Sequence, residues 1–395
     1  MISRLLTPPF GRKSFFLFGP RQVGKSTMVK IALAEKKYVD INLLKSETLL
    51  KYKTNPDLLR REIEFQLKRE KSLTIFIDEI QKAPTLLDEI HYLLEEHKNR
   101  LFFILTGSSA RKLKRSSVNM LAGRAWEFFL YPLTHLELGP LFSLDDMLLK
   151  GSLPPIVNED VTDCFRSLRA YTNTYLKEEI LDEALVRNIP AFSKFLTIAA
   201  DQSGEVVNYS NIARETGVSS KTVRGYYQIL EDTLITLKLE PYLKSARKRL
   251  VRHPKYFLFD PGVINSICGR TTLESIKTPS IYGRLFEHFV ILETFRILSY
   301  WEMNCRFYHW RSAHGAEVDL VVEKDSELWA IEIKSNPVVH SRDLRGLQSF
   351  VADYPSARAL CITTAEQPYL AGNIEVIPWQ MLFESDWLGL KAEGV

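Results

Sequence analysis

One segment constrains this chain more than any other, and it reads Gly19-Pro20-Arg21-Gln22-Val23-Gly24-Lys25-Ser26-Thr27. It fits the pattern G-x-x-x-x-G-K-[ST] at every fixed position, between an apolar stretch, SFFLF, and a helical stretch that begins STMVKIALAE. The two glycines let the backbone wrap tightly, so that successive N–H groups point at phosphate oxygens, and the following helix adds the positive end of its dipole. We therefore expect a P-loop that binds ATP or GTP, with Lys25 on the β- and γ-phosphates and Ser26 on Mg²⁺.

A second apolar run, LTIFI, ends in Asp78 and Glu79. As a strand of the same parallel sheet, it would place Asp78 beside the P-loop to help hold Mg²⁺, and Glu79 would orient and polarise the attacking water. The alternative interpretation is a strand that ends in two solvated acids. A later strand, RLFFIL, leads into Thr106 and Ser108, and either hydroxyl would sense the γ-phosphate.

The short stretch Leu121-Ala122-Gly123-Arg124 adds a cation to these motifs. Arg124 would stabilise the charge of the transferred phosphate, either within its own chain or across the interface of a homo-oligomer. The alternative interpretation is an ordinary surface arginine. ATP is favoured over GTP because the chain has no G-x-N-K-x-D motif for reading guanine.

The pattern of hydrophobic residues divides the chain into regions. Residues 14 to about 140 alternate apolar strands with helical stretches, which predicts an α/β domain with a parallel sheet and crossover helices. A mostly helical stretch with a short hairpin follows to about residue 255, and strands return after it. We expect a core at 1–140, a helical linker or lid at 141–206, and further domains at 207–255 and 256–395.

The composition excludes several classes of protein. With 45% hydrophobic and 25% charged residues, it is typical of soluble globular proteins. No stretch reaches the roughly 18 apolar residues of a membrane helix, and the N-terminus lacks the continuous apolar core of a signal peptide. The four cysteines lie far apart, which indicates reduced thiols, so we expect a cytoplasmic protein without a membrane partner. Lys and Arg number 52 against 48 Asp and Glu, and a net charge of +4 does not by itself require a nucleic-acid partner.

The order of the motifs resembles that of bacterial and archaeal P-loop ATPases of the AAA-plus class that carry a long C-terminal extension of unknown function. The resemblance covers nearly the whole chain and rests on GPRQVGKST, IFIDEIQ, LTGSSARKL, LAGR, LYPLTHLEL, PKYFLFDPGV, YGRLFEHFV, AEVDLVV and IEIKS. It implies an AAA-plus-like core with ATP and Mg²⁺ as cofactors. One departure is GSLPP at residues 151–155, where relatives usually read Gly-Gly-x-Pro-Glu.

Residues 208–239 have the pattern of a helix-turn-helix followed by a strand. A short helix around 210–215 meets a turn at Gly217, and a longer helix runs from about residue 219 to 232. Lys221 and Arg224 share the polar side of the longer helix, and the resemblance implies a winged-helix fold. The basic run that follows favours contact with a DNA backbone, although winged helices also serve as packing and protein-contact modules. That run consists of Lys244, Arg247, Lys248, Arg249, Arg252 and Lys255.

The last region contains acids and a lysine at a spacing that carries metal chemistry. Glu317 and Asp319 fall on one face of a strand, and Glu332 and Lys334 share a face of the next strand. With Glu287 on an upstream helix, these residues resemble the restriction-endonuclease-like fold, written PD-(D/E)XK. Asp319 and Glu332 would hold Mg²⁺ with help from Glu287, and Lys334 would activate water for attack on a phosphodiester. The alternative is a domain of this fold that persists as a binding scaffold.

Three candidate functions follow from these patterns. The first is an ATPase that acts on DNA, or is gated by it, and carries a metal-dependent nuclease domain. The second is an ATP-driven switch or assembly protein whose C-terminal domain binds nucleic acid or protein without cleaving it. A third reading is a stress or defence regulator that uses the winged helix for protein contacts.

Overall fold

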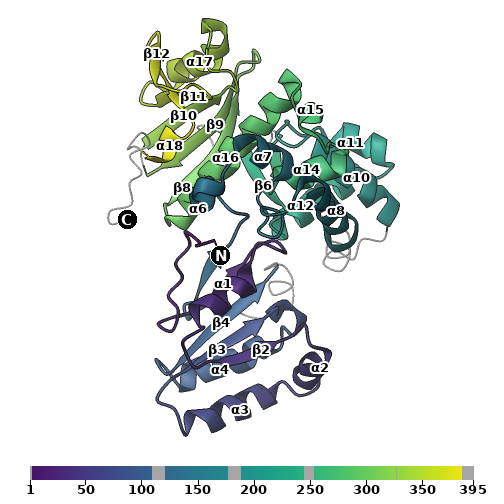
Figure 1. Cartoon of the computed structure of the whole chain (residues 1–395), viewed down its shortest axis with the longest axis vertical. Coiled ribbons are helices and arrows are strands. Elements are labelled where there is room, and N and C mark those ends of the chain that lie inside the picture. The colour runs from purple at the N-terminus through teal and green to yellow at the C-terminus, as the bar shows by residue number, and fades with distance from the viewer. Residues whose placement is uncertain (1, 109–120, 177–187, 244–252, 326, 385–395) are drawn as a thin grey trace.

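The computed structural model describes residues 2–108, 121–176, 188–243, 253–325 and 327–384. Figure 1 shows three groups of elements: an N-terminal sheet with its helices, a group of helices from the middle of the chain, and a second sheet near the C-terminus. The N-terminus lies where these groups meet (Figure 1).

Among the described residues, five parallel strands form the N-terminal sheet in the order β2-β3-β4-β1-β5. They are β1 (Ser14–Phe18), β2 (Val39–Asn42), β3 (Leu73–Asp78), β4 (Leu101–Gly107) and β5 (Ala125–Phe129). The helices of this region are α1 (Lys25–Ala32), α2 (Ser46–Thr54), α3 (Asp57–Leu67) and α4 (Leu86–Glu96), with a 3-10 turn at Ile80–Lys82. The expected parallel sheet is confirmed, and β5 is a strand that the sequence did not predict.

The central strands are mostly apolar because both of their faces are covered. All five residues of β1 are buried, and they alternate between two cores. Phe15 and Leu17 pack into one core, while Phe16 and Phe18 pack into the other. Since the strands are parallel, the segments that follow β1, β3 and β4 lie together at the carboxyl-terminal end of the sheet.

The middle of the chain is helical. Its helices are α6 (His135–Leu138), α7 (Leu144–Lys150), α8 (Val161–Ala170), a π-helical turn at Tyr171–Leu176, α10 (Ile189–Asp201), α11 (Tyr209–Thr216), α12 (Ser220–Asp232), α14 (Pro261–Cys268) and α15 (Leu273–Ile276). A short 3-10 helix at Gly139–Leu141 follows α6. Helices α11 and α12 lie where the sequence predicts two helices, joined by a left-handed turn at Gly217, and the Ser219 side chain caps α12.

Within the described ranges, eight strands form the second sheet in the order β12-β13-β11-β10-β9-β8-β6-β7. They are β6 (Thr236–Pro241), β7 (Lys255–Leu258), β8 (Cys305–Arg311), β9 (Glu317–Lys324), β10 (Glu327–Ile333), β11 (Arg358–Thr363), β12 (Tyr369–Ala371) and β13 (Ile374–Pro378). Because β6 pairs with both β7 and β8, this sheet crosses the boundary expected at residue 255. The helices of this region are α16 (Pro279–Tyr300), a 3-10 turn at Ser341–Leu344, α17 (Arg345–Asp353) and α18 (Met381–Glu384).

Helix α16 connects the second sheet to the N-terminal region. The Tyr300 hydroxyl accepts a hydrogen bond from the backbone N–H of Tyr131 at 2.9 Å. Glu293, further back along α16, accepts from the backbone N–H of His135 at 2.9 Å. Despite the length of α16, none of the helices in the described part of the chain is long and apolar enough to cross a membrane.

Candidate functional site

The P-loop wraps around its own lysine. Gly24 takes the left-handed conformation, with φ of 92°, and α1 begins at the next residue. Lys25 is buried, and its Nζ donates to the carbonyls of Gly19 at 2.7 Å and Pro20 at 2.9 Å. Gly19 approaches the backbone just after β5 so closely that a Cβ on this residue would lie 2.1 Å from the carbonyl oxygen of Leu130. Only glycine therefore fits at the first position of the loop.

A network of hydroxyls and a carboxylate lies directly beside the loop. The Ser26 Oγ donates to Asp78 at 2.8 Å from Oδ1 and 2.9 Å from Oδ2. Thr106 donates to the same carboxylate and accepts from the backbone N–H of Glu79 at 3.2 Å. The hydroxyl and the buried carboxylate are hard oxygen donors placed together, which is the donor set that Mg²⁺ prefers. These residues therefore fit the ion that the resemblance implies.

Glu79 is held by a residue to which the sequence assigned no role. Gln81 is buried, and its Nε2 donates to the Glu79 carboxylate and, at 3.1 Å, to the Ser108 Oγ. Glu79 has a left-handed backbone, with φ of 63°, which turns its side chain out of the strand direction. Thr106 thus contacts Asp78, whereas Ser108 contacts Gln81, which also binds Glu79. The only sequence signal for Gln81 is its place in IFIDEIQ.

The remaining loop residues differ in exposure. Val23 is buried in the core, Arg21 is half-buried, and Gln22 and Thr27 are exposed. Pro20 contributes the carbonyl that Lys25 contacts.

Arg124 lies at the amino-terminal end of the strands, whereas the P-loop lies at their carboxyl-terminal end. It precedes β5, whose Ala125 pairs with Ser14 at the start of β1, whereas the P-loop follows Phe18 at the end of β1. At about 3.3 Å per residue, this separates Arg124 from the loop by roughly 15 Å along the strands. Its guanidinium pairs with Glu95 and donates to the carbonyl of Ala122 at 3.0 Å. The structure therefore places Arg124 away from the P-loop of its own chain, and both a role across an interface and an ordinary surface arginine stay open.

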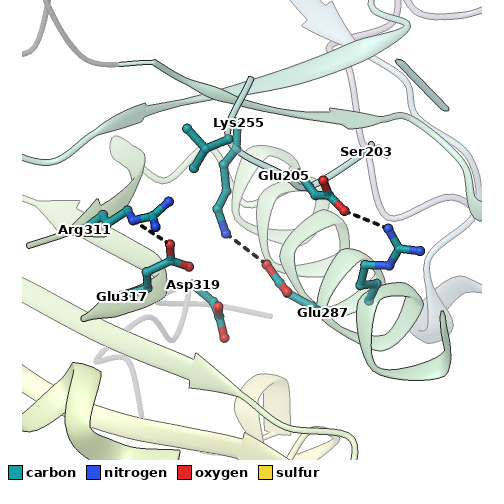
Figure 2. Close-up of a pocket in the computed structure, with 10 residues that line it drawn as sticks. Ser203, Glu205, Lys255, Glu287, Arg311, Glu317 and Asp319 are labelled. Carbon is teal, nitrogen blue, oxygen red and sulfur yellow. Dashed lines mark hydrogen bonds and ion pairs between the residues drawn. The ribbon is translucent and has the colours of Figure 1, made fainter. Parts of the chain in front are cut away.

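A second site is a pocket of about 360 Å³ between the middle helices and the second sheet. Figure 2 shows charged side chains converging on it from β7, α16, β8, β9 and the loop after α10. Its lining residues are Ser203, Gly204, Glu205, Val206, Lys255, Arg284, Glu287, Arg311, Glu317 and Asp319. Glu287 and Asp319 are thus brought together as the sequence predicts, but the cations Lys255, Arg284 and Arg311 were not assigned to this site.

Glu332 and Lys334 lie beside this pocket rather than in its lining. The Lys334 Nζ donates to Glu332 Oε1 at 2.6 Å, and the backbone N–H of Ile333 donates to Asp319 Oδ2 at 2.9 Å. The other oxygen of Glu332, Oε2, is buried and makes no hydrogen bond to the described residues. Continuing the antiparallel register of β9 and β10 places Asp319 opposite Glu332. The structure therefore joins the four expected residues in one acidic neighbourhood but pairs Glu332 with a lysine.

Burial governs the protonation of these groups. It raises the pKa of Glu287 to about 7, against the opposing effect of the Lys255 ammonium and with the charge of Asp319 adding to it. Burial likewise raises the pKa of Glu332 well above its ordinary value. Burial works against the charged form of Lys255, but the carboxylates of Glu287, Asp319 and Glu317 outweigh it and raise the pKa of that lysine.

Of the eight basic residues expected to contact nucleic acid, three are described and five are not. Lys221 and Arg224 are exposed on α12, and the Arg224 guanidinium lies 4.0 Å from the centre of the Tyr209 ring. Lys244, Arg247, Lys248, Arg249 and Arg252 lie outside the described residues. Lys255, expected in the same exposed run, is buried instead because it turns into the pocket to pair with Glu287.

The P-loop side chains and the C-terminal acids differ as metal sites. Over the described ranges, no group of three or more His, Cys, Asp or Glu side chains is arranged to hold a metal ion. At the C-terminal acids, the carboxylates of Glu287 and Glu332 are paired with protein ammonium groups. The Mg²⁺ expected there does not fit the arrangement of these residues.

Comparison with protein families supports the N-terminal assignment. Residues 11–139 match the family model of an AAA domain. Residues 141–274 match a domain of unknown function (DUF8612), and residues 282–382 match another (DUF4143). The N-terminal domain is therefore similar to ATP-binding P-loop ATPase domains.

Similar proteins occur in bacteria and archaea. The uncharacterized proteins Mb2031c of Mycobacterium bovis and Rv2008c of Mycobacterium tuberculosis are each 25% identical to this chain over 366 residues, which cover 92% of this chain and 79% of theirs. The uncharacterized protein MJ1637 of Methanocaldococcus jannaschii is 26% identical over 263 residues, or 51% of this chain and 54% of its own length. None of these names describes an activity.

Proposed function

We propose that this chain is a Mg²⁺-dependent ATPase whose nucleotide state controls its engagement of DNA. The observation that carries the proposal is the contact of the Ser26 hydroxyl with both carboxylate oxygens of Asp78, directly beside the loop that cradles phosphate. Ser26 and Asp78 would hold Mg²⁺, which neutralises charge on the β- and γ-phosphates when bound.

The other residues of this site divide the work of hydrolysis. Lys25 would exchange its bonds to the Gly19 and Pro20 carbonyls for bonds to the β- and γ-phosphates. Glu79 would accept a proton from the attacking water, and Ser108 would sense the γ-phosphate. Arg124 would act on the nucleotide of a neighbouring copy, which makes a homo-oligomer part of the proposal.

Release of phosphate from ATP by the purified full-length chain tests this function. Lys25→Ala should abolish release, whereas Lys30→Ala, an exposed lysine on the same helix, should leave it unchanged. Asp78→Asn should shift the dependence on Mg²⁺ to higher concentration, because one of the two proposed ligands loses its charge. Hydrolysis by Lys25→Ala at the rate of the wild type would reject the proposal.

For the C-terminal half, we propose the binding scaffold rather than the nuclease. We retain the winged-helix fold for 207–255 and the restriction-endonuclease-like fold for 256–395 as proposals. The pairing of Lys334 with Glu332 and of Lys255 with Glu287 favours a scaffold, since both carboxylates already face a protein cation. Arg284 and Arg311 in the pocket, and Lys221 and Arg224 on α12, are the cations proposed to contact DNA phosphates. The four cysteines, which lie far apart in the sequence, favour the cytoplasm.

Two measurements test this half of the proposal. Anisotropy of a short labelled DNA duplex, with and without ATP, should show binding that weakens as salt rises, and an Arg284→Ala, Arg311→Ala double variant should bind less tightly. Arg166→Ala, an exposed arginine on α8, is the control. Plasmid and single-stranded DNA should remain uncut in Mg²⁺ or Mn²⁺. Cutting that an Asp319→Ala, Lys334→Ala double variant abolishes would establish the nuclease instead.

A further inference from the structure

The acids in the pocket of Figure 2 surround a lysine. The Lys255 Nζ lies 3.4 Å from Glu287 Oε1, and its side chain is only 7% exposed. Figure 2 shows Lys255 reaching from its strand toward Glu287, with Glu317 and Asp319 approaching from β9. This lysine therefore sits inside the acidic neighbourhood rather than at its rim.

The backbone holds Lys255 in this place from two sides. On one side it pairs with Leu239 in the β6–β7 ladder, and on the other it forms an isolated bridge with Val206. Hydrogen bonds flank the bridge: the N–H of Val207 donates to Pro254 at 3.0 Å, and the N–H of Gly204 donates to Tyr256 at 2.8 Å. The backbone pairing on both sides thus fixes the direction in which the Lys255 side chain enters the pocket.

The other cations of the pocket have carboxylate partners of their own. Arg284 pairs with Glu205 at 2.8 Å, and Arg311 pairs with Glu317 at 3.0 Å. Among the described residues that line the pocket, three cations therefore face four carboxylates. A divalent ion added to this group would meet the fixed ammonium of Lys255 across a few ångströms, where two positive charges repel each other strongly.

We propose that the ammonium of Lys255 is the resident cation of this pocket and occupies the place that a divalent metal ion would need between Glu287 and Asp319. Three of the four carboxylates in the pocket lining then have a protein cation without a metal, and any ligand that the pocket binds is bound in a metal-independent way. Glu317 and Asp319 still share one face of β9, as the sequence predicts. The cation beside them is the Lys255 ammonium, which β7 supplies, rather than a metal ion. This inference does not depend on ATP hydrolysis or on DNA binding.

Titration of the nucleotide-free, full-length protein with Mn²⁺, followed by electron paramagnetic resonance, tests the proposal. Wild type and Asp319→Asn should bind Mn²⁺ alike. Lys255→Met should gain one site that binds at least about tenfold more tightly, because a positive charge has been removed from a cluster of carboxylates. A Lys255→Met, Asp319→Asn double variant should lose that site again.

Arg311→Met is the matched control. It also removes one positive charge from the pocket, but its ion pair with Glu317 is exposed, so no tight site should appear. A folded Lys255→Met that gains no Mn²⁺ site would overturn the proposal. If Lys255→Met does not fold, as judged by circular dichroism, wild type against Asp319→Asn decides: equal Mn²⁺ binding supports the proposal, and a site lost with Asp319 refutes it.

Discussion

Arg4 donates a hydrogen bond from Nη1 to the carbonyl of Val23, inside the P-loop, at 2.7 Å. The same guanidinium donates from Nη2 to the Tyr300 hydroxyl at 3.1 Å, at the end of α16. Helix α16 also carries Glu287, about 20 Å further back along its axis. One buried guanidinium thus contacts both the loop expected to bind nucleotide and the helix that lines the second pocket.

Replacing Arg4 should cost the protein much of its stability. Its Nε pairs with Glu137 at 2.9 Å, where the arginine side chain is 9% exposed and the glutamate is fully buried. Arg4→Met leaves that carboxylate buried without its cation, so the free energy of unfolding should fall by about 3 kcal/mol in urea denaturation. Arg166→Ala, which breaks the exposed pair with Asp163, should change it by less than about 1 kcal/mol. Equal losses for the two variants would show that the Arg4 contacts are not stabilising.

Glu79→Gln should separate nucleotide binding from hydrolysis. The amide keeps the shape of the side chain and its contact with Gln81, but it cannot accept the proton of the attacking water. Hydrolysis of ATP should fall by about 100-fold or more, while the affinity for a fluorescent ATP analogue stays close to that of the wild type. Glu89→Gln, on α4 away from the loop, should retain full hydrolysis. A Glu79→Gln variant that still turns over ATP rapidly would assign the base to another residue.

The sequence predicts the central N-terminal strands well because they are buried on both faces. LTIFI and FFILT are continuous apolar runs, and such runs indicate strands of a covered parallel sheet. Strand β5, AWEFF, was missed because it lies at the edge of the sheet, with an exposed tryptophan and an exposed glutamate in its middle. Edge strands bury too little to leave a clear pattern.

Tertiary contacts explain the two functional residues that were misplaced. Arg124 follows the other motifs closely in sequence, but its position is set by the parallel pairing of β5 with β1. This pairing puts Arg124 at the amino-terminal end of the strands, away from the P-loop. Lys255 closes a run of basic residues that was expected to contact a DNA backbone. Its partner Glu287 lies on another element, α16, and no local pattern relates the two.

Two helical glycines should respond in opposite directions to alanine. In α17, a Cβ at Gly346 would lie 1.7 Å from the carbonyl oxygen of Glu317, so Gly346→Ala must push the helix off β9 and should cost about 2 kcal/mol or more. In α12, Gly225 faces open space, and Gly225→Ala should raise the free energy of unfolding by about 0.5–1 kcal/mol. Urea denaturation of both variants checks the signs, and destabilisation by Gly225→Ala would contradict the solvent-facing placement of α12 at that residue.

His288 should make the protein less stable in acid. It is 2% exposed and stacks on Phe257, and burial, with the nearby charge of Arg296, lowers its pKa to about 3. Below the ordinary histidine pKa of about 6.5, the unfolded chain binds a proton that the folded chain does not, so stability is complete above that pH and is lost as pH falls toward 3. Between about pH 7 and about pH 5, this group alone should remove about 2 kcal/mol.

The variant His288→Phe isolates that contribution, because it keeps an aromatic ring against Phe257 but cannot take up a proton. Free energies of unfolding measured in urea at both pH values should differ less for this variant than for the wild type, by about 2 kcal/mol. His314→Asn, which replaces an exposed histidine, should keep the pH dependence of the wild type. If His288→Phe loses as much stability in acid as the wild type, then His288 takes up its proton in the folded protein as readily as in the unfolded chain. Its contact with Phe257 on β7 would then have to loosen to admit the charge.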